Sequence, residues 1–179
     1  MGTGEVPNVS VWFREPTRVL ADRSGDTIYA IYPEVNMIIL CPLDTKIVYA
    51  AATIEDPRGF TLDRTGEYFY LASRKLHRIY RLKFAHKVHQ AESVVGNGVA
   101  GTGLLTAPNE IIQLNLPNDV FMDEDNVMYI SDSGNKRIVI IEEGKARVLD
   151  ITTDPPPGSP GAPAYALKNP ESILVIRRE

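Results

Sequence analysis

The sequence predicts an all-β fold built from short antiparallel strands. Three observations carry this prediction. Runs of four to six apolar or β-branched residues alternate with turn-forming clusters, and 13 Gly and 13 Pro interrupt the chain too often for long helices. A pattern of Pro, Asp, Gly and Tyr also recurs along the chain. The clearest strand-like runs are 9–13, 27–31, 46–50, 68–72, 127–131, 137–141 and 172–176.

The composition is that of one globular domain. The chain has 179 residues, of which 44% are apolar and 23% are charged. Its net charge of −4 disfavours a strongly basic nucleic-acid-binding domain. The sequence shows no membrane-spanning apolar run and no signal-peptide pattern, and the single Cys41 excludes an internal disulfide. We therefore expect an intracellular location.

An internal repeat defines the architecture. Its copies start at Pro16, Pro57 and Pro117, and a further copy starts at Pro170. Each full copy has an Asp after the Pro, then a Gly or Asn, a Tyr and an Ile at matching spacings. These residues are Asp22, Gly25, Tyr29 and Ile38 in the first copy, Asp63, Gly66, Tyr70 and Ile79 in the second, and Asp123, Asn126, Tyr129 and Ile138 in the third.

Each recurring residue has a structural role. Pro can open a strand but lacks the N–H needed inside a central one. The Asp accepts backbone hydrogen bonds where the first strand ends, and Gly or Asn takes the positive φ of the turn. The Tyr lies in the second strand, the Ile belongs to the third, and a later run such as 92–96 or 147–151 supplies the fourth. Four antiparallel strands per repeat predict the blades of a β-propeller.

The third copy, with the Gly-rich segment before it, resembles an NHL repeat. That family's pattern is a Gly-rich loop, Gln-Leu, Pro, a short strand ending in Asp, a Tyr strand and then Asp-x-x-Asn-x-Arg-Ile. The matching residues are Gln113, Leu114, Pro117, Asp123, Tyr129, Asp132, Asn135, Arg137 and Ile138. Asp132 and Arg137 flank a loop at 133–136 and are expected to pair across a hairpin. The second copy keeps Pro57, Asp63 and Tyr70, but the first two copies lack the Asp-x-x-Asn pair.

The resemblance covers roughly residues 16–176 and implies a single propeller domain. We expect a tail at 1–8 followed by the domain at 9–176. Its predicted parts are blade 1 at about 16–51, blade 2 at about 57–96, a loop at 97–116, blade 3 at about 117–151, a Pro-rich loop at 154–163 and the start of blade 4 at 170–176. Five prolines within 155–163 favour a stiff connector over a motif that recruits a proline-reading domain.

The number of blades predicts an open structure. NHL-type domains resemble closed rings of about six blades. This chain supplies three blades and the start of another, so we expect unpaired strand edges and apolar blade faces that need a cover. The resemblance and the open edges favour a non-catalytic scaffold that binds a protein partner, or a second copy that completes the ring. A longer polypeptide is the other way to complete it.

A basic segment offers an alternative function. Residues 74–89 hold all three histidines and six of the 19 Lys and Arg, with no acidic residue. The candidate binding residues are Arg74, Lys75, His77, Arg78, Arg81 and Lys83. They favour RNA or another polyanion as a second hypothesis, whereas a solvated outer strand is the simpler interpretation. Strand alternation would send Ile79 and Arg81 to one face and Tyr80 to the other.

No catalytic, cofactor or metal site is predicted from the residues. The G-x-G-x-x-G pattern at 96–101 follows a strand-like run but no helix-forming segment comes after it, so we interpret it as an inter-blade loop. Some six-bladed propellers that resemble NHL domains are lyases or lactonases with metal ligands around a central channel. An enzyme of that kind, completed by another chain or by further residues, is the third hypothesis.

Overall fold

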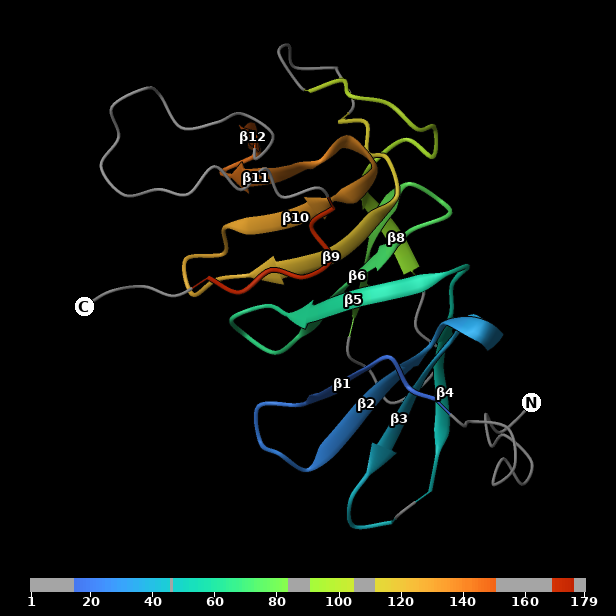
Figure 1. Ribbon diagram of the computed structural model, residues 1–179. Coiled ribbons are helices and arrows are strands. Elements are labelled where there is room, and N and C mark those ends of the chain that lie inside the picture. Colours follow the sequence, from blue (N-terminus) through green and yellow to red (C-terminus); the bar gives the residue numbers. More distant parts are fainter. Residues whose placement is uncertain (1–14, 46, 84–90, 105–111, 151–168, 176–179) are drawn as a thin grey trace, which may run out of the picture.

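The computed structural model describes residues 15–45, 47–83, 91–104, 112–150 and 169–175. Within them the chain forms three sheets of four antiparallel strands, stacked as blades from the lower to the upper part of Figure 1. The all-β prediction with three four-stranded blades is confirmed, and no ring closes within the described residues. The predicted tail at 1–8, the strand at 9–13 and the Pro-rich loop at 154–163 lie outside the described residues.

Each blade contains four consecutive strands in sequence order. Blade 1 comprises β1 (Arg18–Ala21), β2 (Thr27–Tyr32), β3 (Met37–Pro42) and β4 (Tyr49–Thr53). Blade 2 comprises β5 (Pro57–Leu62), β6 (Tyr68–Ser73), β7 (Arg78–Lys83) and β8 (Ala91–Val95). Blade 3 comprises β9 (Pro117–Met122), β10 (Met128–Asp132), β11 (Arg137–Glu142) and β12 (Lys145–Asp150). Short 3-10 turns, η1 (Pro33–Val35) and η2 (Ser133–Asn135), join the second and third strands of blades 1 and 3.

Two predicted strands differ from the structure. The run at 46–50 lies mostly before β4, because the side chains of Asp44 and Thr45 bond the backbone of residues 45 and 47 and extend the turn. The described residues of the last run, 172–175, form no ladder strand. They lie beside β9 and are attached to blade 3 largely through side chains, as described below.

The repeated Asp and Gly or Asn form the turn between the first and second strands of every blade. Asp22, Asp63 and Asp123 each accept a hydrogen bond from the backbone N–H that opens the next strand or directly precedes it, at 2.9–3.2 Å. The matching residues Gly25, Gly66 and Asn126 have φ of 80°, 74° and 61°. The predicted turn chemistry is therefore present in all three repeats.

The core consists of the two layers between blades. Between blades 1 and 2, buried Ile31 and Ile38 pack with Phe60, Phe69 and other apolar side chains. Between blades 2 and 3, Ile79 and Ala72 belong to a cluster with Val120, Ile130 and Val139. Ile79 packs toward blade 3 and Leu82 toward blade 1, which is the alternation expected for β7.

The first strands of the three blades lie next to one another. β5 contacts both β1 and β9, so β1, β5 and β9 form the inner edge of the stack. Among the described residues, no helix is long and apolar enough to cross a membrane. The inner edge brings together residues from every repeat, and the functional analysis starts there.

Candidate functional site

Four equivalent repeat positions converge at the inner edge of the blades. Each lies two residues after the Pro that starts its repeat: Arg18, Gly59, Asp119 and Ser172. We call them the axial cluster. They come from β1, from β5, from β9 and from the segment 169–175.

Asp119 is the centre of the axial cluster. Its side chain is fully buried, and Oδ2 accepts hydrogen bonds from Arg18 Nη1 at 2.9 Å, Ser172 Oγ at 2.8 Å and the Ile173 N–H at 3.0 Å. Oδ1 accepts the N–H of Val120 at 2.9 Å. A fully desolvated carboxylate requires this many donors, because an uncompensated buried charge is costly.

Gly59 makes room for that carboxylate. A Cβ at this position would lie 1.9 Å from Asp119 Oδ1 and 2.6 Å from Asp119 Cα. Atoms that are not bonded to each other do not approach so closely, so a side chain at position 59 would displace Asp119 or its strand. A glycine here is what allows β5 and β9 to lie close together.

The axial cluster holds the chain together through bonds that occupy its acidic group. Asn118 Nδ2 also donates to the carbonyl of Glu171 at 2.8 Å, and the hydroxyls of Ser131 and Ser133 donate to the carbonyl of Pro170. These contacts place 169–175 against blade 3 as the start of a further repeat. Both oxygens of Asp119 are engaged by protein donors, so the cluster ties the first repeat, the third repeat and this segment together.

A second buried network surrounds the Asp132–Arg137 hairpin. Arg137 Nε lies 2.6 Å from Asp132 Oδ2, and these two residues are direct cross-strand partners, as predicted. Arg137 also donates to the carbonyls of Thr102 and Gln113, each at 2.8 Å. Asn135 Nδ2 donates to Asp132 Oδ2 and to the carbonyl of Gly101, each at 2.8 Å. The network fixes the Gly-rich loop and the segment before β9 onto blade 3.

Blade 2 uses a simpler form of the same device. Ser73 occupies the repeat position of Asp132, and its hydroxyl donates to the carbonyl of Glu55 at 2.5 Å. In blade 3, Asp132 Oδ1 instead accepts the N–H of Asn115 at 2.6 Å. Glu55 and Asn115 both lie two residues before the Pro of their repeats. The second repeat lacks Asp-x-x-Asn but keeps a hydrogen bond between the same two repeat positions. Ser73 is the donor in the second repeat, whereas Asp132 is the acceptor in the third.

His77 is a structural connector between blades 2 and 3. Its Nδ1 accepts the N–H of Leu116 at 3.0 Å, which assigns the ring proton to Nε2 when the imidazole is neutral. Leu116 and His77 both have positive φ, 50° and 52°. The hydrogen bond thus fixes two unfavourable backbone conformations at the start of the third repeat.

Replacing His77 by Ala is expected to destabilise the fold by about 1–3 kcal/mol, because it leaves the Leu116 N–H without its acceptor. His77→Asn is the matched control, since Asn tolerates positive φ and offers an acceptor oxygen. Urea unfolding followed by circular dichroism measures both variants. Equal stabilities for the Ala and Asn variants would contradict this role.

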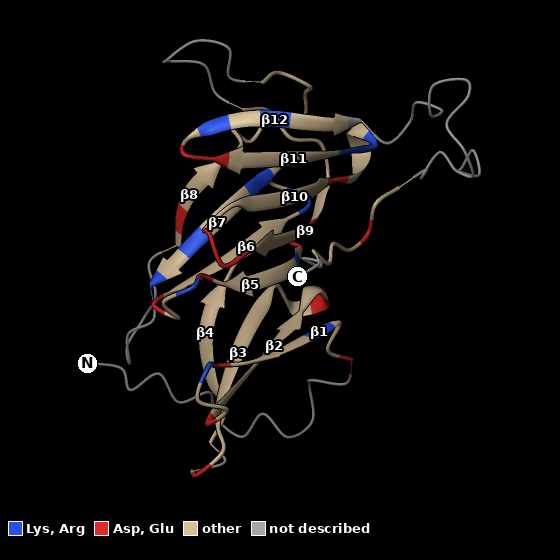
Figure 2. Cartoon of the chain, turned by 90° about the vertical axis from the view of Figure 1, so that its left-hand side faces the viewer, with Lys and Arg blue, Asp and Glu red and all other residues tan. Residues whose placement is uncertain are grey.

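Four more of the predicted basic residues, Lys75, Arg78, Arg81 and Lys83, also have side-chain partners within the chain. Lys75 pairs with Glu55 at 2.5 Å and Arg81 with Glu92 at 2.6 Å, and these hydrogen bonds raise the pKa of both cations. Arg78 Nη2 donates to the carbonyl of Asn97 at 2.9 Å, and Lys83 lies over the ring of Tyr68. Figure 2 shows the basic strand β7 next to the acidic position of β8. Within β7, strand alternation places Arg78 on one face and Arg81 and Lys83 on the other, and Lys75 lies in the turn before the strand.

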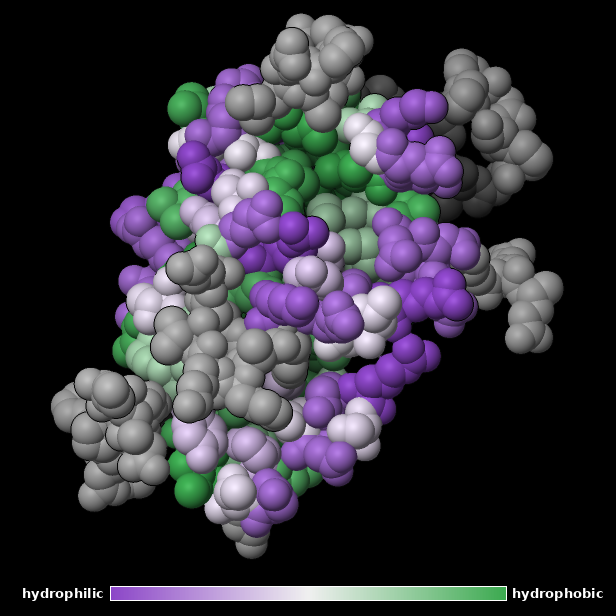
Figure 3. All heavy atoms as spheres, turned by 180° about the vertical axis from the view of Figure 1, so that it is seen from behind, coloured by the Kyte–Doolittle hydropathy of each residue, from purple (hydrophilic) through white to green (hydrophobic). Residues whose placement is uncertain are grey.

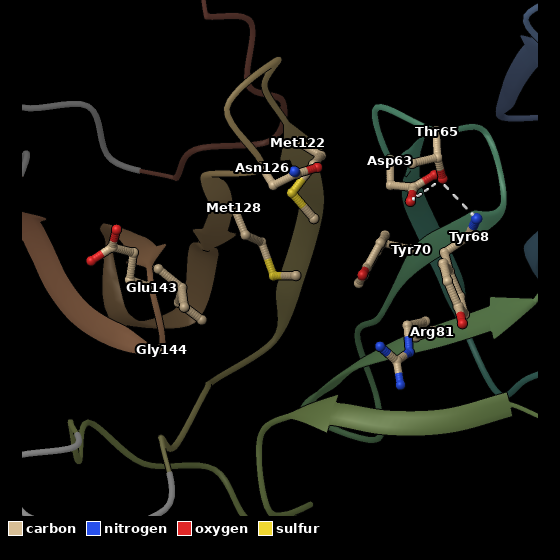
Figure 4. A pocket seen from close by; sticks show the side chains of 11 residues that line it. Asp63, Thr65, Tyr68, Tyr70, Arg81, Met122, Asn126, Met128, Glu143 and Gly144 are labelled. Atoms are coloured by element: carbon tan, nitrogen blue, oxygen red, sulfur yellow. Dashed lines mark hydrogen bonds between the residues drawn. The ribbon is translucent and has the colours of Figure 1, made fainter.

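A pocket of about 360 Å³ lies between blades 2 and 3 on the side of the Asp turns. Figure 4 shows Tyr68, Tyr70 and Arg81 on one wall and Met122, Met128 and Glu143 on the other. The guanidinium of Arg81 lies 4.8 Å from the centre of the Tyr68 ring. Seen from behind, Figure 3 shows apolar surface between hydrophilic groups in the upper half, where blades 2 and 3 lie. The lining combines two tyrosines, two methionines and Ile141 with the polar side chains of Asp63, Thr65, Arg81, Asn126 and Glu143. Within the described ranges, no three His, Cys, Asp or Glu side chains are placed to hold a metal ion.

Comparison with known proteins supports the fold but gives no family. No protein-family model and no curated protein matches the sequence. Virginiamycin B lyase from Staphylococcus aureus, solved as a catalytically inactive form with quinupristin, is 16% identical with a TM-score of 0.55, covering 83% of this chain and 44% of the lyase. A protein of unknown function from Bacteroides thetaiotaomicron is 16% identical with a TM-score of 0.58, covering 76% and 36%. An auxiliary nutrient binding protein from the same organism is 15% identical with a TM-score of 0.55, covering 68% and 32%.

These similarities show a β-propeller fold. At such low identity they extend to the arrangement of strands and no further. The chain spans less than half the length of each of these three proteins. Its three blades therefore correspond to a part of a larger propeller in the structures it resembles.

Proposed function

We propose that the chain is an NHL-type partial propeller that works as a non-catalytic protein-interaction scaffold. Two features support the proposal. The acidic group at the inner edge, Asp119, is occupied by bonds to its own chain. The outer blades carry exposed apolar side chains, which is typical of surfaces that dock onto another protein.

The distribution of exposed apolar side chains is the observation that carries the proposal. Leu149 on β12 is 53% exposed, Leu174 is 75% exposed and Val19 on β1 is 56% exposed. The other large apolar side chains found exposed in the described residues are Val35, Leu43, Ile47 and Val99. None of these seven belongs to the described strands of blade 2, the blade covered on both faces. Val19 and Leu149 therefore place exposed apolar surface on strands of the two end blades, where a further blade would pack, whereas Val35, Leu43, Ile47 and Val99 lie in turns and loops.

The proposed partner is a protein that presents a blade-like β surface, and a second copy of the chain is one such protein. The outward face of blade 3 resembles the faces already packed inside the stack, because Phe121, Ile138 and Leu149 alternate with the residues that face blade 2. The start of a further repeat already lies against this blade. Completion by another β sheet would bury these side chains and pair the exposed edge.

The double variant Leu149→Glu with Leu174→Glu tests the proposal. Light scattering on a sizing column is expected to show a wild-type species of about twice the 19.8 kDa chain mass, and the double variant is expected to be monomeric. Val99→Glu is the matched control, because Val99 is 60% exposed but lies in the Gly-rich loop and not on a strand of an end blade. Two results together would contradict the proposal: the wild type is a monomer, and the double variant is no more soluble than the wild type.

Two other functions remain as alternatives. RNA binding through 74–89 would require Arg78 and Arg81 to exchange their contacts with Asn97 and Glu92 for phosphate. It predicts an affinity that falls steeply with salt and is lost when Arg74, Arg78 and Arg81 are reversed in charge. An enzymatic role, as part of a lyase or lactonase propeller completed by another chain, predicts activity only in the completed assembly.

A further inference from the structure

Blade 2 holds two arginines whose hydrogen-bonding capacity is incompletely used. Arg58 follows the repeat Pro in β5, and Arg74 follows the last residue of β6. Within the described part of the chain, the Nε atoms of both are buried and have no hydrogen-bond partner. A buried donor without an acceptor costs about 1–3 kcal/mol, and more when the group is charged. Native structures retain few such groups, and each one calls for a physical cause.

The two arginines originate from neighbouring points. Their preceding residues, Pro57 and Ser73, are direct cross-strand partners. Both arginines also contact Asp56: Arg58 Nη2 lies 2.7 Å from Asp56 Oδ1, and the Arg74 N–H donates to the Asp56 carbonyl at 3.1 Å. Asp56 itself has a positive φ of 46°. The strand pairing therefore brings both residues to one corner of blade 2.

The repeat indicates where these side chains point. The residues equivalent to Arg58 and Arg74 in the third repeat are Asn118 and Ser133. Both reach across to the start of the following repeat, where Asn118 donates to the Glu171 carbonyl and Ser133 to the Pro170 carbonyl. By this equivalence, we expect Arg58 and Arg74 to face the seam between blades 2 and 3. Unlike Asn118 and Ser133, which bond the carbonyls of the following segment, Arg58 and Arg74 leave their Nε atoms without an acceptor.

The charges at this corner favour an anion. Asp56 is the carboxylate paired with the Arg58 guanidinium, whereas Arg74 contacts Asp56 through its backbone N–H, so this carboxylate balances the charge of Arg58. The neighbouring Glu55 is paired with Lys75, and Asp119 is paired with Arg18. The corner therefore carries an excess of positive charge together with donors that lack acceptors. Guanidinium groups bind carboxylate and phosphate oxygens in a bidentate geometry.

We propose that Arg58 and Arg74 form a binding site for a small oxyanion, the carboxylate or phosphate group of a ligand, at the seam of blades 2 and 3. The bound oxygens would accept from the two Nε–H groups and replace the missing partners. This site is separate from the apolar end faces, so its test is independent of the scaffold function. The site also differs from the RNA-binding hypothesis, because it combines Arg74 with Arg58, which lies outside the basic segment 74–89.

Titration calorimetry with inorganic phosphate and, separately, with malonate tests the site at constant ionic strength set with NaCl. The wild type is expected to bind at least one of the two saturably, with one site per chain, and the stronger ligand identifies the preferred oxyanion. Arg58→Lys and Arg74→Lys keep the charge but remove the Nε donor, and each is expected to weaken binding about tenfold. Arg147→Gln, an exposed arginine on β12, is the matched control and should bind as the wild type does.

Several outcomes would overturn the inference. The site is rejected if neither anion binds saturably, or if the Lys variants bind as well as the wild type, since a general charge effect survives replacement by Lys. Far-ultraviolet circular dichroism identifies any variant that fails to fold. Arg74→Met then provides the second measurement: unchanged or higher stability, with no phosphate or malonate effect on the wild-type melting temperature, would show that the buried Nε serves no ligand.

Discussion

Replacing Arg137 by Ala is expected to lower the free energy of unfolding by about 3–5 kcal/mol, because it leaves a buried carboxylate without its counter-ion. Asp132 is fully buried, and Arg137 is its ion-pair partner at 2.6 Å. The same substitution removes the donors to the carbonyls of Thr102 and Gln113. Urea unfolding monitored by circular dichroism measures the loss.

The controls for Arg137 separate its charge from its shape. Arg137→Lys keeps the charge but can make only part of the contacts to Asp132, Thr102 and Gln113, so an intermediate loss is expected. Arg147→Gln lies on the neighbouring strand with its side chain exposed, and should change stability by less than about 0.5 kcal/mol. A loss below about 1 kcal/mol for Arg137→Ala would show that the network does not hold the Gly-rich loop.

Replacing Asp119 by Ala is expected to cost a similar amount, about 3–5 kcal/mol, because Arg18 loses its buried partner and Ser172 and Ile173 lose their acceptor. Unlike the Arg137 variant, this one should also release the segment 169–175. Limited proteolysis is expected to cleave within that segment much faster than in the wild type. Unchanged cleavage would mean that the side-chain bonds from Asn118 and Ser133 to the carbonyls of Glu171 and Pro170 hold the segment without Asp119.

Gly59→Ala tests the same cluster from the opposite side. The new methyl group would lie 2.6 Å from Asp119 Cα, which requires β5 and β9 to separate. We expect a loss comparable to Asp119→Ala, together with the same release of 169–175. Gly25→Asn is the control, because its surroundings are open and Asn accepts the positive φ, as Asn126 does in the third repeat.

The local features of the fold were predictable from the sequence because each depends on nearby residues. Asp63 and Gly66 define a turn within a few positions, and Asp132 meets Arg137 across one hairpin loop. The contacts between repeats were not predicted. Arg18 and Asp119 are 101 residues apart, and neither belongs to the recurring pattern of residue types. A comparison of the positions two residues after each Pro would have revealed a basic, a small, an acidic and a hydroxyl side chain.

The basic segment shows the other limit of sequence reasoning. Its charges are visible in the sequence, but their partners depend on strand register and bulges. Arg81 lies opposite Glu92 only because β7 and β8 pair in one register, with a shift between Ile79 and Tyr80. Arg58, which composition alone would not single out, becomes notable only through its buried Nε.

The position of Asp119 in the sequence affects the order in which the repeats can assemble during synthesis. Ribosomes release the chain from the amino end, so Arg18 emerges 101 residues before its counter-ion. The first two blades can therefore pair while Arg18 still lacks this acceptor, and the segment 169–175 can bind only after blade 3 is in place. Assembly along the repeats is thus expected to run from the amino end, and the contacts of 169–175 with Asp119 form last among the described residues.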